Sequence, residues 1–160
     1  MTLIVKYVHL LSIAIWTGSI VFFSFIGAPA VFKALDRQTA GDVVGEIFPK
    51  YFLLGQSLCA LALASLAYIG HTLDAFGNSA VRAGIAILIV MGAIAVYSGN
   101  VNGPEAREVK RLVRVEQDAA KKEELRKKFG RLHGISVILN IITLALGLVL
   151  LWLSLRYLAI

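Results

Sequence analysis

Four stretches of the chain contain no Asp, Glu, Lys or Arg. They cover residues 7–32, 51–73, 83–104 and 132–155, and are 26, 23, 22 and 24 residues long. A helix crosses the ~30 Å hydrocarbon core of a bilayer in about 20 residues, so each stretch can span it once. Backbone in lipid must satisfy its own hydrogen bonds in a helix or a closed barrel, and barrel strands are about half as long. The four stretches therefore predict four transmembrane helices.

The predicted fold is all-α and integral to the membrane, a four-transmembrane-helix bundle forming a single domain over residues 1–160. The spans are expected at about 3–28, 50–72, 81–102 and 132–156. A composition of 58% hydrophobic and 16% charged residues fits this class better than a soluble domain. The lipid bilayer is thus the first expected partner. The net charge of +6 is explained by loop charges, so no nucleic-acid partner is inferred.

The connection between the third and fourth spans predicts an amphipathic cytoplasmic helix over about 104–128. Its apolar residues recur at roughly helical spacing, Glu124 and Lys128 form a favourable i,i+4 pair, and Pro104 suits a first turn. Its basic face is a candidate surface for anionic lipid or for a partner protein. The alternative is a solvated charged helix beneath the bundle. The residues assigned to this surface are Arg111, Arg114, Lys121 and Lys122.

The basic residues also predict an orientation. Four spans place both termini on one side, and that side receives only Lys6, Arg82 and Arg156. The other 13 of the 16 Lys and Arg residues fall in the first and third loops. Short cytoplasmic loops carry an excess of Lys and Arg. We therefore expect these loops in the cytoplasm and both termini outside, in the plasma membrane or a bacterial inner membrane.

Polar residues of the first and last spans follow one helical spacing. Separations of 3, 4, 3 and 4 residues place each set on a single helix face, and polar residues in membrane helices turn toward the bundle interior. The two sets are His9, Ser12, Trp16, Ser19 and Phe23, and His133, Ser136, Asn140, Thr143 and Gly147. The expected polar interior comprises Ser12, Ser19, Asn100, His133, Ser136, Asn140 and Thr143. Ordinary helix packing is the alternative reading of the small polar residues.

The three histidines are the candidate ligands of a cofactor. His9 and His71 are expected near the outer ends of their helices, beside Lys6, whereas His133 begins the last span on the opposite side. Helix rise then prevents His9 and His133 from holding one ion together. Imidazole is a common ligand of transition metals and of haem. His9 and His71 are the candidate metal ligands, with Trp16 as their neighbour in a cofactor site for haem b or a transition metal. A hydrogen-bonded structural role is the alternative.

Four motifs carry a family resemblance over nearly the whole chain: "VHLLSIAIWTGSIVFF", "GEIFPKYF", "NVNGP" and "FGRLHGISVILN". On these, the chain resembles the small four-helix membrane family typified by transmembrane protein 205, whose bacterial members are mostly catalogued as a domain of unknown function. More distantly, His9 followed by Trp16-Thr17-Gly18 is similar to the copper-resistance-D and HemJ-like membrane superfamily. That likeness implies haem, porphyrin or copper handling with His9 as ligand. The chain lacks the lysine that HemJ-type proteins carry in a later helix.

Three functions compete on the sequence. The first is a metal- or haem-binding membrane protein for metal handling or electron transfer. The second is a permease or channel for a small solute or ion, which four helices could form only as a homo-oligomer. The third is a scaffold that binds lipid or a partner through the basic helix. No nucleophile–base set is visible, so the sequence does not indicate an enzyme.

Overall fold

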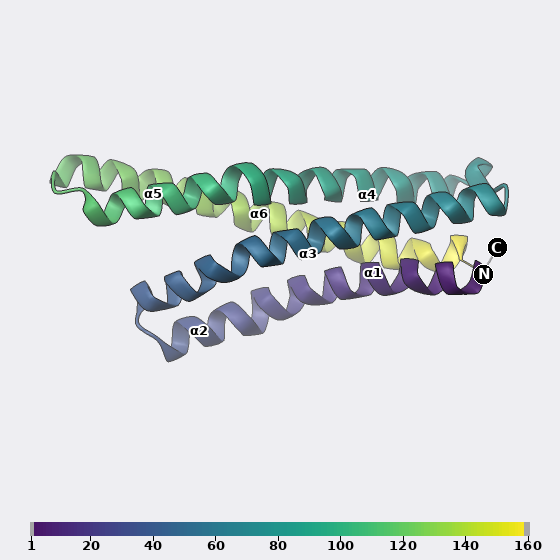
Figure 1. Ribbon diagram of the computed structural model, residues 1–160, viewed down its shortest axis with the longest axis horizontal. Helices are drawn as coiled ribbons and strands as arrows, with labels where there is room; N and C mark the ends of the chain where they lie inside the picture. Colours follow the sequence, from purple (N-terminus) through teal and green to yellow (C-terminus); the bar gives the residue numbers. More distant parts are fainter. Residues whose placement is uncertain (1, 159–160) are drawn as a thin grey trace.

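The computed structural model describes residues 2–158, and four helical rods run nearly the whole length of the molecule (Figure 1). They cover Thr2–Ala34, Arg37–Thr72, Ser79–Val115 and Ala119–Tyr157, with 33 to 39 residues each. At 1.5 Å per residue such rods are about 50–60 Å long, well beyond the ~30 Å of a hydrocarbon core. The prediction of an all-α bundle with four membrane-crossing helices is confirmed.

Two of the rods contain a wide helical turn directly before a proline. The first rod consists of α1 (Thr2–Phe22), a π-helical turn at Phe23–Gly27 and α2 (Ala28–Ala34). The third consists of α4 (Ser79–Tyr97), a π-helical turn at Ser98–Asn102 and α5 (Gly103–Val115). In both, the proline follows the turn by two residues. A proline ring clashes with the carbonyl four residues earlier, and a wider turn moves that carbonyl away. The first helix therefore continues past Pro29 to Ala34.

Side-chain caps fix the other helix boundaries. Asp36 caps α3 (Arg37–Thr72) by accepting hydrogen bonds from the amides of Gln38 and Thr39 at 3.0 and 3.1 Å. Asn78 caps α4 through the Ala80 amide at 2.8 Å. A capping side chain satisfies amides that have no partner within the helix. The link between α3 and α4 includes a short 3₁₀ turn, Ala75–Gly77.

The cytoplasmic helix expected over 104–128 is two helices, which corrects the sequence-based boundary. The helix that begins at Gly103 ends at Val115, and α6 (Ala119–Tyr157) begins after a break at residues 116–118. Asp118 caps the new helix by accepting from the amides of Ala120 and Lys121 at 2.8 and 3.0 Å. Since α6 continues into the last span without interruption, α5 and the start of α6 form an antiparallel hairpin.

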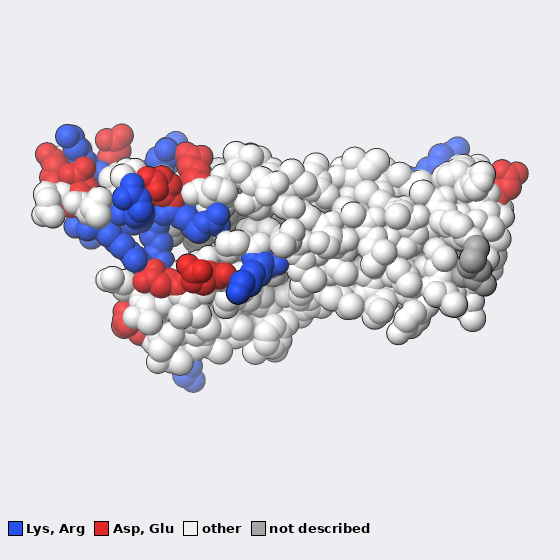
Figure 2. Space-filling model, in the orientation of Figure 1, with Lys and Arg blue, Asp and Glu red and all other residues white. Residues whose placement is uncertain are grey.

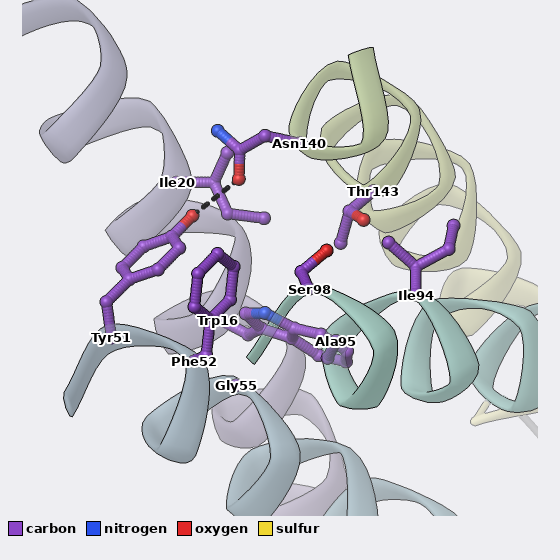
Figure 3. A pocket seen from close by; sticks show the side chains of 10 residues that line it. All are labelled: Trp16, Ile20, Tyr51, Phe52, Gly55, Ile94, Ala95, Ser98, Asn140 and Thr143. Carbon is purple, nitrogen blue, oxygen red and sulfur yellow. Dashed lines mark hydrogen bonds between the residues drawn. The ribbon is translucent and has the colours of Figure 1, made fainter. Parts of the chain in front are cut away.

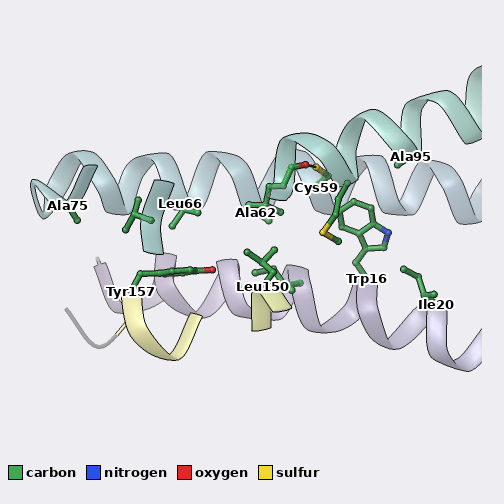
Figure 4. Packing of buried hydrophobic residues seen from close by; sticks show 13 residues of the cluster. Trp16, Ile20, Cys59, Ala62, Leu66, Ala75, Ala95, Leu150 and Tyr157 are labelled. Atoms are coloured by element: carbon green, nitrogen blue, oxygen red, sulfur yellow. Dashed lines mark hydrogen bonds between the residues drawn. The ribbon is translucent and has the colours of Figure 1, made fainter. Parts of the chain in front are cut away.

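The core lies in the part of the bundle that has few charges. α1 packs against α3 and α6, and α4 packs against the same two helices. The side chains of Ile13, Leu66, Leu88, Met91 and Leu150 are fully buried. Figure 4 shows side chains of this cluster meeting between the helices, with Tyr157 lying between α1 and α3. Glycine permits the closest approach, because a Cβ at Gly147 would stand 2.6 Å from Thr17 Oγ1.

The rods separate toward the end that carries the first and third loops. There the α2–α3 pair diverges from the α5–α6 pair (Figure 1). In the space-filling view, red and blue side chains gather over this end, and the long middle of the molecule is white (Figure 2). The uncharged middle is the length that suits a bilayer core, and the charged end extends beyond it.

Candidate functional site

A hydrogen-bonded histidine holds three helices together at the end with both termini. His9 is fully buried, its Nδ1 lies 2.9 Å from the Ala62 carbonyl oxygen, and its Nε2 lies 2.8 Å from the Tyr157 hydroxyl. A carbonyl only accepts, so Nδ1 carries the proton and Nε2 accepts from Tyr157. Beside it, Lys6 donates to the Leu158 carbonyl at 2.8 Å. This His9–Tyr157 clamp links α1, α3 and α6.

The clamp bears directly on the expected metal site. A metal at His9 would have to displace either Ala62 or Tyr157 from a ring nitrogen. His71 is exposed, near the end of α3. Within residues 2–158 no cluster of three or more His, Cys, Asp or Glu side chains could hold a metal ion. The ligand roles of His9 and His71 stay predictions.

The polar stripes are satisfied mostly within their own helices. Ser12, Ser19 and Thr143 donate to the carbonyls of Val8, Trp16 and Leu139, at 2.8, 2.7 and 2.8 Å. Ser12 and Thr143 are buried, whereas Ser19 is half-buried. Serine and threonine often bond back to their own helix in this way. These three residues therefore need no ligand to satisfy their hydroxyl protons.

Asn140 makes the longer connections. Its Oδ1 accepts from the Tyr51 hydroxyl at 2.7 Å, and its Nδ2 donates to Ser24 Oγ at 2.9 Å. One side chain of α6 thereby reaches α3 and the π-helical turn of the first rod. Polar pairs of this kind hold membrane helices in register.

A polar residue buried in the π-helical turn after α4 is Asn102. Its Nδ2 donates to the Leu132 carbonyl at 3.2 Å and to Ser136 Oγ at 2.7 Å. Asn100 and His133, both expected in the interior, are exposed. The sequence does carry a signal for Asn102. The buried residues of this rod recur at separations of 3 and 4, through Val81, Gly84, Leu88, Met91, Ala95, Ser98 and Asn102.

A cleft opens where the rods separate at the charged end. Its volume is ≈ 360 Å³, in the range of ligand pockets. Aromatic side chains from three helical rods give it an apolar interior, and basic side chains stand at its edges. It is lined by Phe32, Arg37, Gly41, Val44, Gly45, Phe48, Phe52, Gly103, Ala106, Arg107, Lys110, Phe129, His133 and Ser136.

The charges of the cleft are unbalanced. None of its lining residues is Asp or Glu. Lys110 is bound to Asp42 at 2.8 Å, and Arg114 shares the same carboxylate. Within residues 2–158, Arg37 and Arg107 have no ion pair and no hydrogen bond from their side chains. Two guanidinium groups at this cleft therefore stand without a protein anion.

The cleft lies where the uncharged length of the rods ends. Counting ~20 residues along each charge-free stretch from the end nearer the termini reaches residues 26, 54, 102 and 136. Phe52 and Ser136 thus lie close to the end of the length that a hydrocarbon core would cover, and the arginines lie beyond it. Basic side chains face the gap between the two charged lobes in Figure 2. The surface residues Arg111, Arg114, Lys121 and Lys122 do not line this cleft.

The fold and the charge distribution define the class as an integral membrane protein with four apolar membrane-crossing helices. The family described as "Domain of unknown function (DUF4149)" matches residues 11–114, from α1 to α5, and the chain belongs to this family. An "Uncharacterized protein" of Aquifex aeolicus (strain VF5) is 52% identical over 54 residues, which are 34% of this chain and 39% of the relative. The chain therefore aligns with less than half of that relative's length. No solved structure matches the chain.

Proposed function

We propose that the protein binds an anionic phospholipid in the cleft at its charged end. The headgroup phosphate lies between Arg37 and Arg107. The first part of the acyl chains lies on the aromatic side chains of the apolar interior, which we call the floor of the cleft. The observation that carries the proposal is the pair of arginines without a protein anion, above an apolar floor at the membrane surface.

The arginines favour phosphate. A guanidinium group offers planar, paired donors that fit two phosphate oxygens at once. Lys110 adds positive charge at the same edge, although its bond to Asp42 partly neutralises it. With no carboxylate lining the cleft, nothing repels an anion there.

The floor favours a lipid over a soluble phosphate. Phe32, Phe48, Phe52 and Phe129 line the cleft, and Phe48 stacks on Phe52 with ring centroids 5.7 Å apart. An apolar surface of this size contributes nothing to binding inorganic phosphate, but it stabilises a hydrocarbon chain through burial. An amphiphile meets both halves of the cleft.

The excess of basic residues supports a direction in the membrane. We propose the orientation predicted from the loops, with the cleft facing the cytoplasm and both termini outside. Anionic lipids are concentrated in cytoplasmic leaflets, so this orientation would present the cleft to its ligand. A labelling experiment on Lys6, compared with Lys121, in intact cells and in permeabilised cells distinguishes the two directions.

Native mass spectrometry tests lipid binding. The protein in mild detergent is titrated with phosphatidylglycerol or with phosphatidylcholine, and the bound fraction is counted. The double variant Arg37→Gln/Arg107→Gln should bind phosphatidylglycerol about 30-fold more weakly, because each cation near the membrane surface contributes ~1 kcal/mol and 1.4 kcal/mol is a factor of ten. The matched control is Arg126→Gln/Arg131→Gln, which removes the same charge outside both the cleft and the candidate lipid surface of the basic helix, and should bind as the natural protein does.

Three outcomes contradict the proposal. Equal binding of phosphatidylglycerol and phosphatidylcholine by the natural protein would show that the arginines do not select an anion. Displacement of phosphatidylglycerol by millimolar inorganic phosphate would identify a soluble anion site instead of a lipid site. Equal losses in the two double variants would assign the effect to net charge.

The finer predictions of the sequence stay predictions beside this proposal. They are haem or metal handling through His9, transport by a homo-oligomer, and the resemblances to transmembrane protein 205 and to the copper-resistance-D and HemJ-like proteins. The third competing function, a scaffold that binds lipid or a partner through the basic helix, also stays a prediction, because the residues assigned to that surface do not line the cleft.

A further inference from the structure

A second, much smaller cavity lies inside the bundle, where all four rods meet. Its volume, counted as the room open to the centres of water molecules, is ≈ 20 Å³. Trp16 of α1, Gly55 of α3, Ser98 at the end of α4 and Thr143 of α6 are among its walls. In Figure 3 the labelled side chains surround this space, and the indole nitrogen of Trp16 and the hydroxyl of Ser98 lie within it.

Two polar groups at this cavity have no protein partner. Trp16 and Ser98 are only 4% and 3% exposed. Within the part of the chain that the structure describes, neither the Trp16 Nε1–H nor the Ser98 hydroxyl makes a side-chain hydrogen bond. Buried polar groups are nearly always paired with protein or with ordered water. The cavity therefore presents one free donor and one group that both donates and accepts.

Acceptors stand on the opposite wall. The Thr143 hydroxyl uses its proton for the Leu139 carbonyl at 2.8 Å, which leaves oxygen lone pairs free. Asn140 Oδ1 accepts from Tyr51 and has a second lone pair. No charged residue lines the cavity. Its occupant is therefore neutral and must both donate and accept hydrogen bonds.

We propose that this cavity binds one water molecule, which accepts from the Trp16 Nε1–H and exchanges with the charged-end cleft past the ring of Phe52. The volume matches one water, since about 10–15 Å³ of this kind of space suffices. The proposal stands apart from lipid binding, because it concerns a different cavity and a different ligand.

The side chains around the small cavity determine the route by which water enters it. Toward the end with both termini, the next layer is the fully buried Ile13, Leu88 and Met91, which offers water no partner. Phe52 lines both the cavity and the cleft. Tyr51 separates the cavity from a groove between α1 and α3, but its hydroxyl is held by Asn140 at 2.7 Å. Phe52 has no hydrogen bond and is held by ring contacts alone, with Phe48 at 5.7 Å and Tyr51 at 5.3 Å between centroids, so rotation of its ring is the simplest opening.

Nuclear magnetic resonance of ¹⁵N-indole-labelled protein in detergent micelles tests this directly. The chain has two tryptophans, and Trp152→Phe assigns the Trp16 resonance. The Trp16 indole proton should show magnetisation transfer from water. The variant Phe52→Leu, with a smaller wall, should raise its exchange rate at least five-fold. The control Phe129→Leu makes the same change in the cleft away from the cavity and should leave the rate unchanged.

Removing a polar group from the cavity wall provides the reverse test. Thr143→Val replaces the hydroxyl with a methyl group, and the transfer from water to the Trp16 indole proton should fall at least five-fold. Absence of transfer in the natural protein overturns the water site. Equal exchange rates in Phe52→Leu and Phe129→Leu overturn the route. If Phe52→Leu fails to fold, the Thr143→Val comparison still decides whether water is bound.

Discussion

Removal of one hydroxyl, in Tyr157→Phe, tests the clamp at the end with both termini. In the natural chain this hydroxyl donates to His9 Nε2 at 2.8 Å, and both side chains are fully buried. The phenylalanine variant keeps the ring but leaves the Nε2 lone pair without a donor. No other side chain in residues 2–158 bonds to that nitrogen. The variant thus isolates the cost of an unsatisfied buried acceptor.

The expected loss of stability is about 1.5 kcal/mol. A buried polar group left without a partner costs ~1–3 kcal/mol in soluble proteins. Hydrogen bonds between membrane helices average ~0.6 kcal/mol and reach about 1.7. The upper part of the membrane range applies, because the clamp is fully buried and no water can replace the lost donor. This loss raises the equilibrium constant for unfolding about ten-fold.

Reversible unfolding in mixed phospholipid–detergent micelles, titrated with SDS and followed by circular dichroism, measures the loss. The matched control is Tyr7→Phe, which removes the same hydroxyl from α1 at a side chain that is 63% exposed. It should change the free energy of unfolding by less than ~0.3 kcal/mol, as other surface changes do. Equal stability of the two variants would refute the clamp. In a His9→Leu background the Tyr157→Phe change should lose most of its cost, because the acceptor is already gone.

Two further predictions concern packing and capping. Gly147→Ala places a Cβ 2.6 Å from Thr17 Oγ1 and should lower the free energy of unfolding by ~1–3 kcal/mol. The control Gly134→Ala has open space around the new Cβ and should leave the free energy of unfolding unchanged. Adding Thr17→Ala to Gly147→Ala should restore the lost stability. Hydrogen bonds from Thr39 lower the pKa of Asp36 below its ordinary 3.8, so the cap stabilises α3 above that pH and is lost as pH falls through the lowered value. Amide exchange of Thr39 should therefore accelerate in acid, and Asp36→Asn should keep the protection and remove the pH dependence; protection of Thr39 that is independent of pH would contradict the capping argument.

The four apolar membrane-crossing helices were predictable because charge is costly in lipid. Residues 83–104 lack charge, and α4 with its π-helical turn covers nearly the same residues. The helix lengths were not predictable in this way. Residues 37–50 and 119–131 carry many charges, yet they continue α3 and α6 beyond the apolar stretches. The length of a charge-free stretch reflects the thickness of the bilayer, whereas the helix itself can extend beyond the bilayer into water.

The partner of His9 was missed for a related reason. The stripe on the last span, at Asn140, Thr143 and Gly147, continues at the same spacing through Leu150 and Ser154 to Tyr157, and its members from Thr143 onward are buried. The polar set predicted for the last span ends at Gly147. Tyr157 lies beyond Arg156, outside the charge-free stretch. The spacing was therefore a better guide to the interior than the absence of charge.

The cleft depends on geometry that spacing cannot give. Arg37 and Arg107 are 70 positions apart, and they share a cleft because α3 and α5 diverge at the charged end (Figure 1). The Pro104 that opens α5 follows a wide turn, so the rod continues straight into the charged region. A sequence pattern shows which face of a helix is apolar, but not where two helices separate.

The two ends of the bundle therefore have opposite characters. At the end with the termini, the His9–Tyr157 clamp and the fully buried Ile13, Leu88 and Met91 fill the interior. At the charged end, a cleft of ≈ 360 Å³ reaches Phe52, and a small polar cavity follows it. Passage from one end of a single chain to the other would therefore require both the clamp and the apolar layer to open.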